Sequence, residues 1–346
     1  MIRTGRVVFV ALALVVSSLT SPSFLGAQAK PIELKIAMWV GATHPGGICA
    51  KQWSDELEKR TGGRIKAIYY YSEALGKAPT YADLLQSGGT DAATVMPGYS
   101  PGRFPLLEIM NLPFMWPDGD VPNRVYCDLF SKGHFNKELA KYKLLYLGTT
   151  APYDIIARDP IRTPAEAKGK RLRSGGGPWT STIAAWGGVP VTIPAAEIYP
   201  ALERGILDGN VQGIAPAFNL KLHEIAKFVN LAGIGSYGYF LGMNLDYYKK
   251  LPPEVRIVID DLAAEQQKNP TQGRIFSEEA EKAVRQLPGL GVTVYRPTPE
   301  ILEQWKLLGR PVIEKWIKDT EDKGLPGKQI VDDLLASAKK YNVAPW

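Results

Sequence analysis

The alternation of apolar and polar positions predicts an α/β protein in which strands and helices follow one another. Residues 34–38 alternate as a half-buried strand, and Cys49, Trp53 and Leu57 recur at helical spacing before Thr61-Gly62-Gly63 ends the helix. In the first half of the chain we expect further strands at 65–69, 92–96 and 144–148, a short helix at 81–86 and an apolar connection at 106–114. Such alternation is typical of layered α/β folds.

A second unit begins after Ala151. Thr163-Pro164-Ala165-Glu166 forms a capping box with proline at the first helical position, which predicts a short helix at this point. The strands expected in this unit are 153–157, 171–173, 189–193, 209–214 and 234–243, and the helices are 179–186 and 195–204, the second bent or restarted at Pro200.

The last third of the chain is mainly helical. A long polar helix is expected from 253 to about 286 with a kink at Asn269-Pro270, followed by a strand at 292–295 and helices at 299–320 and 326–340. No internal repeat, low-complexity tract or flexible linker separates the units. We therefore expect two lobes joined by several strand crossings.

The first 29 residues have the three-part pattern of a secretory signal peptide. Arg3 and Arg6 precede an apolar run over 7–19, and small residues then lead to an A-x-A cleavage site before Lys30. This run is shorter than the roughly 20 apolar residues of a membrane-spanning helix. We expect a soluble exported protein of 317 residues, the 346 of the chain less the first 29.

Composition and charge narrow the class of protein. Hydrophobic residues make up 45% and charged residues 22%, which supports a packed core and excludes the disordered and fibrous classes. The net charge of +6 falls to +4 once the two leader arginines are removed, and the basic residues are dispersed. This pattern excludes a nucleic-acid groove.

Cysteine and histidine are scarce. Cys49 and Cys127 either pair or remain as two buried thiols, and both readings are open from the sequence. The three histidines, His44, His134 and His223, belong to no HExxH or Cys/His cluster. We therefore expect no metal site and no cofactor.

Catalytic motifs are weak. Residues 233–238 match GxGxxG, but residues 239–243 read as a strand where the dinucleotide mechanism needs a helix. Residues 41–47 have P-loop-like spacing without the lysine and Ser/Thr that follow it, and there is no G-x-S-x-G. We expect no catalytic residues.

One stretch suits an anionic ligand. Arg171 and Arg173 alternate on a short strand, so their side chains share a face, and the Ser174-Gly-Gly-Gly turn opens the next helix. A guanidinium beside a helix N-terminus can hold a carboxylate by two parallel charge-assisted bonds. The alternative interpretation is that both arginines are surface charges on an edge strand.

This stretch belongs to a set of motifs that runs almost from end to end of the mature chain. The set comprises Thr61-Gly62-Gly63-Arg-Ile-Lys, Leu75-Gly76, Asn111-Leu112-Pro113-Phe114, Thr163-Pro164 through Gly169-Lys-Arg-Leu-Arg173, Glu197-Ile-Tyr199 with Ala201-Leu202, Gly205-Ile-Leu-Asp208-Gly209, and Asn244 before Leu251-Pro252. In order and spacing it resembles the DctP-like solute-binding subunit of tripartite ATP-independent periplasmic (TRAP) carboxylate transporters.

The resemblance implies a two-lobed, type II-like periplasmic binding fold with hinge-crossing strands, a long helix and a cleft that closes over one organic acid. We assign 1–29 to the signal peptide, 30–151 to the first lobe with parts of about 240–290, 152–239 to the second lobe with parts of the C-terminal helices, and 290–346 to helices packing on both. Arg173 occupies the position that grips the ligand carboxylate in this family, and Arg171 is expected to serve structure.

Three positions depart from sialic-acid-binding relatives. Tyr153 stands where they carry a second arginine, Gln212 where they carry an asparagine, and Met96 where they carry an acidic residue of the first lobe. A multiply hydroxylated sugar acid is therefore unexpected, and a four-carbon dicarboxylate less expected than a monoacid.

Aromatic residues are the candidates for the rest of the pocket. Trp39 ends the first strand, Trp179 opens the helix after Arg173, and Tyr237 lies on a crossing between the lobes. The alternative for each is a place in the core, since the chain has 8 Trp and 16 Tyr. Trp186, Tyr239 and Phe240 are assigned to the core.

These inferences predict a periplasmic, monomeric binding protein that passes a small organic acid, best an aromatic or apolar monocarboxylate, to membrane permease subunits. Three alternatives stay open: a ligand that is a dicarboxylate or keto acid, with Arg158, Arg103 or water as the second partner; a secreted enzyme using Asp208 or Glu197; and a sensor subunit.

Overall fold

The computed structural model describes residues 30–116 and 120–343, which from Pro31 onward form one compact unit with two mixed sheets. The first sheet has the order β2-β1-β3-β10-β4 and consists of β1 (Ile32–Ala37), β2 (Ile65–Tyr70), β3 (Ala92–Val95), β4 (Tyr142–Thr149) and β10 (Gly238–Asn244). β1 runs parallel to β2 and β3, whereas β10 runs antiparallel to both β3 and β4.

The second sheet has the order β11-β9-β5-β8-β6-β7. Its strands are β5 (Tyr153–Ala157), β6 (Arg171–Ser174), β7 (Val189–Thr192), β8 (Gly209–Gly213), β9 (Phe228–Asn230) and β11 (Thr293–Tyr295). β6 is parallel to its neighbours β7 and β8, and β5 is antiparallel to β8 and β9. The predicted α/β class is therefore confirmed.

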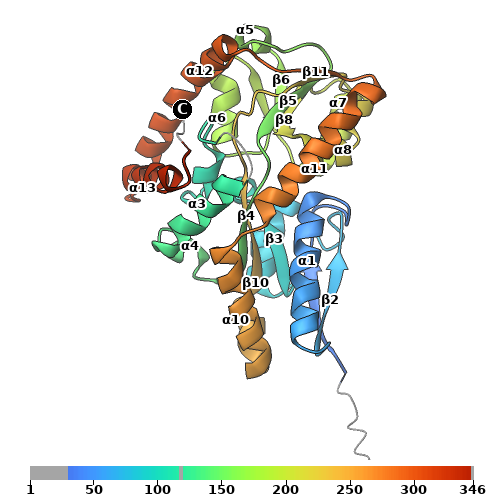
Figure 1. The fold of residues 1–346 in the computed structure, drawn as a ribbon, viewed down its shortest axis with the longest axis vertical. Helices are drawn as coiled ribbons and strands as arrows, with labels where there is room; N and C mark the ends of the chain where they lie inside the picture. Colours follow the sequence, from blue (N-terminus) through green and yellow to red (C-terminus); the bar gives the residue numbers. More distant parts are fainter. Residues whose placement is uncertain (1–29, 117–119, 344–346) are drawn as a thin grey trace, which may run out of the picture. The chain divides into compact units, whose positions relative to one another are not determined.

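Helices cover both sheets (Figure 1). They are α1 (Pro45–Arg60), α2 (Tyr81–Ser87), α3 (Asp120–Ser131), α4 (Asn136–Leu139), α5 (Pro164–Ala167), α6 (Pro178–Ala185), α7 (Ile198–Glu203), α8 (Ile214–Asn219), α9 (Leu245–Lys250), α10 (Pro253–Lys268), α11 (Gln272–Gln286), α12 (Pro299–Glu321) and α13 (Gly327–Lys340). α11 packs on α8 beside the second sheet and on α1 and α3 beside the first, so this one helix contacts elements of both.

Two of the segments that carry the chain between the sheets lie side by side. The Thr150 amide donates to the Tyr237 carbonyl at 3.0 Å, the Tyr153 amide to the Gly235 carbonyl at 2.5 Å and the Ile234 amide to the Tyr153 carbonyl at 2.7 Å. These bonds tie residues 150–153 to residues 234–237. The predicted strand crossings are therefore present, whereas independent motion of the two sheets as lobes stays a prediction.

Several elements were predicted correctly, because the buried positions and the capping residues that the sequence indicated are present in the structure. α1 buries Cys49, Trp53 and Leu57, and α5 begins with the expected capping box, in which Glu166 accepts from the Thr163 amide. The expected helix over 195–204 is a 3₁₀ turn, η4 (Ala195–Glu197), followed by α7, whose first turn accommodates Pro200.

Other predictions are corrected. The expected helix over 253–286 is two helices, α10 and α11, because the chain breaks rather than kinks at Asn269-Pro270. The expected strand over 234–243 begins at Gly238, since the preceding residues form the crossing. β9 and the helices α3, α4, α8 and α9 were not predicted.

The remaining expectations concern termini and cysteines. The predicted signal peptide, 1–29, lies outside the described residues. Among the residues that the structure describes, no helix is long and apolar enough to cross a membrane. Cys49 and Cys127 are both buried free thiols, so the open question of a disulfide is decided against pairing.

Candidate functional site

Arg173 is the centre of the candidate site. It lies on β6 between Val191 of β7 and Asn210 of β8, and its side chain is 1% exposed. Its Nε donates to the Ile193 carbonyl at 3.0 Å and its Nη2 to the Tyr99 hydroxyl at 2.8 Å. Within 30–116 and 120–343, Arg173 is the one arginine or lysine that is buried. Because burying a cation is costly without polar partners, its position points to a binding role.

Arg171 differs from Arg173 in every contact. It is exposed, and its backbone N, Nε and Nη2 donate to the Asp208 carboxylate at 2.7, 3.0 and 2.6 Å. This pairing lowers the pKa of Asp208, which is therefore unsuited to act as a general acid. The interpretation of both arginines as surface charges is wrong for Arg173 and right for Arg171.

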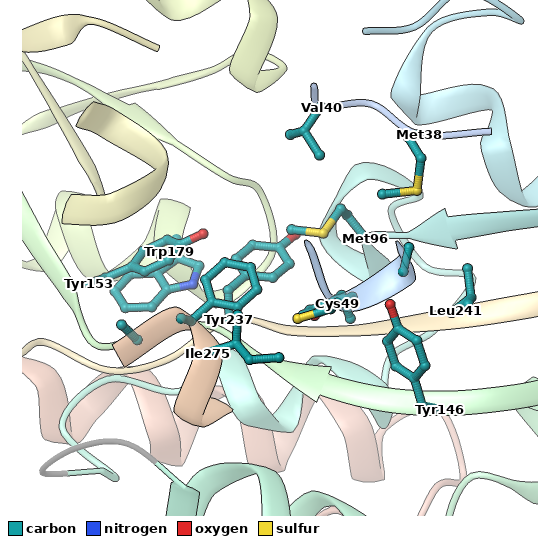
Figure 2. Close-up of a cluster of buried hydrophobic side chains, with 14 of the residues drawn as sticks. Met38, Val40, Cys49, Met96, Tyr146, Tyr153, Trp179, Tyr237, Leu241 and Ile275 are labelled. Carbon is teal, nitrogen blue, oxygen red and sulfur yellow. The ribbon is translucent and has the colours of Figure 1, made fainter. Parts of the chain in front are cut away.

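Three of the predicted residues form an aromatic stack beside Arg173. The ring centroids of Tyr153 and Trp179 are 4.7 Å apart with the planes at 25°, and those of Tyr153 and Tyr237 are 5.8 Å apart at 30°. Figure 2 shows the three side chains together with Met96 in one buried cluster. The stack belongs to different parts of the chain, namely the start of β5, the first turn of α6 and the crossing before β10.

Tyr153 and Tyr237 are polar as well as aromatic. The Tyr237 hydroxyl donates to the Gly175 carbonyl at 3.0 Å, in the glycine-rich turn that follows β6. Burial raises the pKa of both phenols, and the nearby positive charge of Arg173 partly offsets this for each. Both therefore present neutral hydroxyl groups near the guanidinium.

Met96 and Trp39 reach this cluster from the first sheet. Met96 follows β3 and is 5% exposed within the same apolar cluster as the stack. Trp39 follows β1, is half-buried at the margin of the cluster and packs edge-on against His44, with centroids 5.1 Å apart. The structure thus brings Met96 to the stack, while contact of Trp39 with a ligand stays a prediction.

Gln212 shares a sheet face with Arg173. Arg173 is the register partner of Asn210, and Asn210 and Gln212 lie two positions apart on β8, so their side chains share one face of the sheet. The Asn210 Nδ2 donates to the Gln212 Oε1 at 3.1 Å, and the Asn210 Oδ1 is buried without a partner. Both amides are neutral, so this face carries one buried positive charge.

Two residues near Arg173 were missed by the sequence analysis. Tyr99 ends the 3₁₀ turn η2 (Pro97–Tyr99) after β3, and its position in the loop that follows a sheet strand could have indicated it. Glu108, in the 3₁₀ turn η3 (Leu107–Asn111), is 8% exposed and lies so close to Gly177 that a Cβ there would be 2.6 Å from its Oε2. Burial raises the pKa of Glu108 to about 7.

The histidines and acidic residues of the described part of the chain are dispersed. Among those residues, no group of three or more His, Cys, Asp or Glu side chains could hold a metal ion. The buried His44 accepts from the Gly46 amide at 3.0 Å, and burial lowers its pKa to about 3, which keeps the ring neutral. Glu197 is exposed.

The comparisons with known proteins agree with the motifs. Residues 36–319 match the family described as bacterial extracellular solute-binding protein, family 7. The C4-dicarboxylate-binding periplasmic protein DctP of Rhodobacter capsulatus is 26% identical over 296 residues, which cover 83% of this chain and 86% of that protein.

Two solved structures share the fold closely. One is a marine metagenome TRAP solute-binding protein specific for aromatic acid ligands, in complex with metahydroxyphenylacetate, with a TM-score of 0.84, 26% identity and coverage of 90% of this chain and 100% of that one. The other, from Rhodoferax ferrireducens, contains copurified benzoate and has a TM-score of 0.85, 25% identity and coverage of 90% and 98%.

The family match begins in β1 and ends in α12, so it includes both sheets, the crossings and Arg173. The resemblance inferred from the sequence motifs is confirmed. The chain belongs to family 7 of the bacterial extracellular solute-binding proteins, the periplasmic binding subunits of TRAP transporters.

Proposed function

We propose that the protein captures an aromatic or apolar monocarboxylate and delivers it to the membrane permease of its transporter. The observation that carries this proposal is a buried guanidinium, that of Arg173, next to the buried Tyr153–Trp179–Tyr237 stack. A carboxylate can take two charge-assisted bonds from the free N–H groups of a guanidinium, while an aromatic or branched body packs against the rings.

The charge balance argues against a second carboxylate on the ligand. A second anion would be desolvated without a cation, which costs free energy unless a partner is present. Arg103 donates to Gln86 at 2.8 Å and also bonds Asp83 and Tyr142, so its guanidinium is already engaged. Arg158 is exposed and donates to the Leu202 carbonyl at 3.1 Å.

The relatives support both the preferred ligand and its rival. The two structural relatives described above hold metahydroxyphenylacetate and benzoate, which are aromatic monoacids. The Rhodobacter capsulatus relative is named for C4-dicarboxylates. A C4-dicarboxylate is therefore the second candidate, and the test must separate the two classes.

The test is a thermal-shift panel of matched acids followed by calorimetry. The pairs are benzoate with phthalate, phenylacetate with homophthalate, and butyrate with succinate. Because a ligand that binds only the folded protein raises the melting temperature, we expect the largest shifts with benzoate and phenylacetate. Tighter binding of the diacid in all three pairs would refute the monoacid proposal and favour the dicarboxylate.

A binding role also predicts that the ligand leaves unchanged. We propose that no reaction is catalysed. Of the two carboxyls that the secreted-enzyme alternative names, Asp208 is held as an anion by Arg171 and Glu197 is exposed. The NMR spectrum of the acid should be identical before and after prolonged incubation with stoichiometric protein. A new product signal that grows with protein concentration would favour the secreted-enzyme alternative.

A further inference from the structure

A turn of the first sheet lies directly on the ligand-binding turn of the second. Gly176 has a φ of +86°, and a Cβ on it would overlap the Gly98 carbonyl oxygen. A Cβ on Gly98 would in turn overlap the Tyr237 hydroxyl. The two backbones can approach this closely because both positions are glycine. The contact brings Tyr99, the residue after Gly98, next to Arg173.

The Tyr99 hydroxyl accepts two hydrogen bonds from residues on the side of the second sheet. One comes from Arg173 Nη2 at 2.8 Å and the other from the Ala195 amide at 3.2 Å. A tyrosine hydroxyl has acceptor capacity for both bonds and one hydrogen of its own. With its acceptor positions used by two N–H donors, the O–H of Tyr99 is left to act as a donor.

The bonds of Arg173 define where a carboxylate can sit. Its Nε–H is taken by the Ile193 carbonyl and one Nη2–H by Tyr99, out of five N–H groups on a guanidinium. A carboxylate must therefore approach the Nη side of the fork rather than the Nε side. One of its oxygens then lies beside the Tyr99 hydroxyl, which is already bonded to the same Nη2.

We propose that Tyr99 is a specificity-determining residue that donates its O–H to the carboxylate held by Arg173. The inference rests on the proposed function and adds a second, neutral donor to the site. Since Tyr99 follows β3 and Arg173 lies on β6, a ligand bridging them bonds both sheets at once. Tyr99 thereby makes retention of the acid depend on the approach of the two turns.

The test compares Tyr99→Phe with wild type in calorimetry and stopped-flow binding, with benzoate as the probe. If benzoate gives no thermal shift, the probe is the acid with the largest shift in the panel. Loss of a hydrogen bond to a charged group predicts roughly 10- to 100-fold weaker binding. We expect most of the loss in a faster dissociation rate. The melting temperature of the ligand-free protein should also fall somewhat, because Arg173 Nη2 and the Ala195 amide lose their acceptor.

The matched control is Tyr81→Phe, because the Tyr81 hydroxyl is buried without a partner. A spectroscopic readout separates donation from a structural effect. The carboxyl signal of bound ¹³C-labelled probe should move between wild type and Tyr99→Phe, and stay in place in Tyr81→Phe.

Binding by Tyr99→Phe within twofold of wild type, or an unmoved carboxyl signal, would overturn the role of Tyr99 and leave the proposed function standing. Failure of wild type to bind any acid in the panel would instead overturn both.

Discussion

Tyr153 and Trp179 stack face to face, with ring centroids 4.7 Å apart, although 26 positions separate them in the chain. Both rings are buried, and Tyr153 lies at the position where sialic-acid-binding relatives are expected to carry an arginine. A second guanidinium here would have to displace this packing. The aromatic stack thus occupies the space that a second ligand-binding arginine would need.

Arg173→Ala should abolish acid binding without unfolding the protein. A lost charge-assisted bond costs about 1.5–3 kcal/mol, and the unpaired ligand carboxylate adds to this. Arg173→Lys should also bind poorly, because an ammonium group cannot reproduce the fork. Calorimetry together with circular dichroism measures binding and folding in the same samples.

The control for this series is Arg171→Ala. Arg171 is exposed and paired with Asp208, so its loss should cost little stability and leave binding nearly normal. Wild-type affinity in Arg173→Ala, or equal losses in the two alanine variants, would show that the wrong arginine has been identified.

Met96→Ala should weaken binding of aromatic acids and also destabilise the fold. Removing a buried methionine side chain costs about 2–5 kcal/mol of unfolding free energy. Met243→Ala is the matched control, since Met243 on β10 is fully buried in the same cluster but was not assigned to the site. Urea titration should show similar losses of stability, and calorimetry a loss of affinity in Met96→Ala alone. Equal affinities would place Met96 in the core only.

Stability should fall as the pH rises from about 4.5 toward 7, in part because of Glu108. Its pKa is raised from 4.5 to about 7, first by burial and then by the neighbouring Glu138, while Lys323 acts in the opposite direction. Since the folded state disfavours the ionised carboxylate, the unfolded chain loses its proton first. The resulting penalty is absent below pH 4.5, grows up to pH 7 and is constant above it.

Glu108→Gln should remove that penalty. The free energy of unfolding of the variant minus that of wild type should therefore be roughly 1–3 kcal/mol larger at pH 8 than at pH 4. Urea unfolding at both pH values checks the size and the sign. Glu303→Gln, at an exposed position of α12, is the control and should show the wild-type pH profile. A variant at Glu108 that loses stability at pH 8 would contradict the assigned direction.

The two cysteines should be unreactive while the protein is folded. Burial raises the pKa of Cys49 and of Cys127 to about 12, so the reactive thiolate is scarce near neutral pH. A thiol reagent should label neither residue in buffer and both in guanidinium chloride. Rapid labelling of native protein, or a mass two hydrogens lower before reduction, would contradict the buried free thiols.

The mature protein should begin at Lys30. The A-x-A pattern at residues 27–29 predicts cleavage there, and intact-mass measurement of protein from the periplasm tests it. A periplasmic species that still carries residues 1–29 would refute the assignment.

Much of the fold could be predicted because burial periodicity is a local property. α1 followed from the spacing of Cys49, Trp53 and Leu57, and α5 from its capping box. The pairing of β10 between β3 and β4 could not be predicted, because it depends on contacts between residues about 90–150 positions apart. Single-chain periodicity carries no information on which strands become neighbours.

The candidate site likewise has residues that the sequence indicated and residues that depend on contacts distant in the chain. The strand and its glycine turn indicated an anion site with two candidate arginines, the family resemblance selected Arg173, and the structure adds that Arg173 is buried. For Tyr99 the sequence offers only its place after a strand, since its hydrogen bond with Arg173 depends on the approach of Gly98 to Gly176, two glycines that lie 78 positions apart in the chain. Glu108 was missed for a related reason, because an acidic residue gives no indication of burial until the turn opposite it is known.

The place of β10 in the first sheet has a consequence for how the protein is made. β3 and β4 are not neighbours in this sheet; β10, residues 238–244, fills the gap between them. When residues 30–151 have been synthesised, four of the five strands are therefore present, but the position between β3 and β4 is still unfilled. Until residue 244 emerges, the edges of β3 and β4 are unpaired and exposed to other chains. The exported chain must therefore be kept from pairing with others until most of the second sheet has been synthesised.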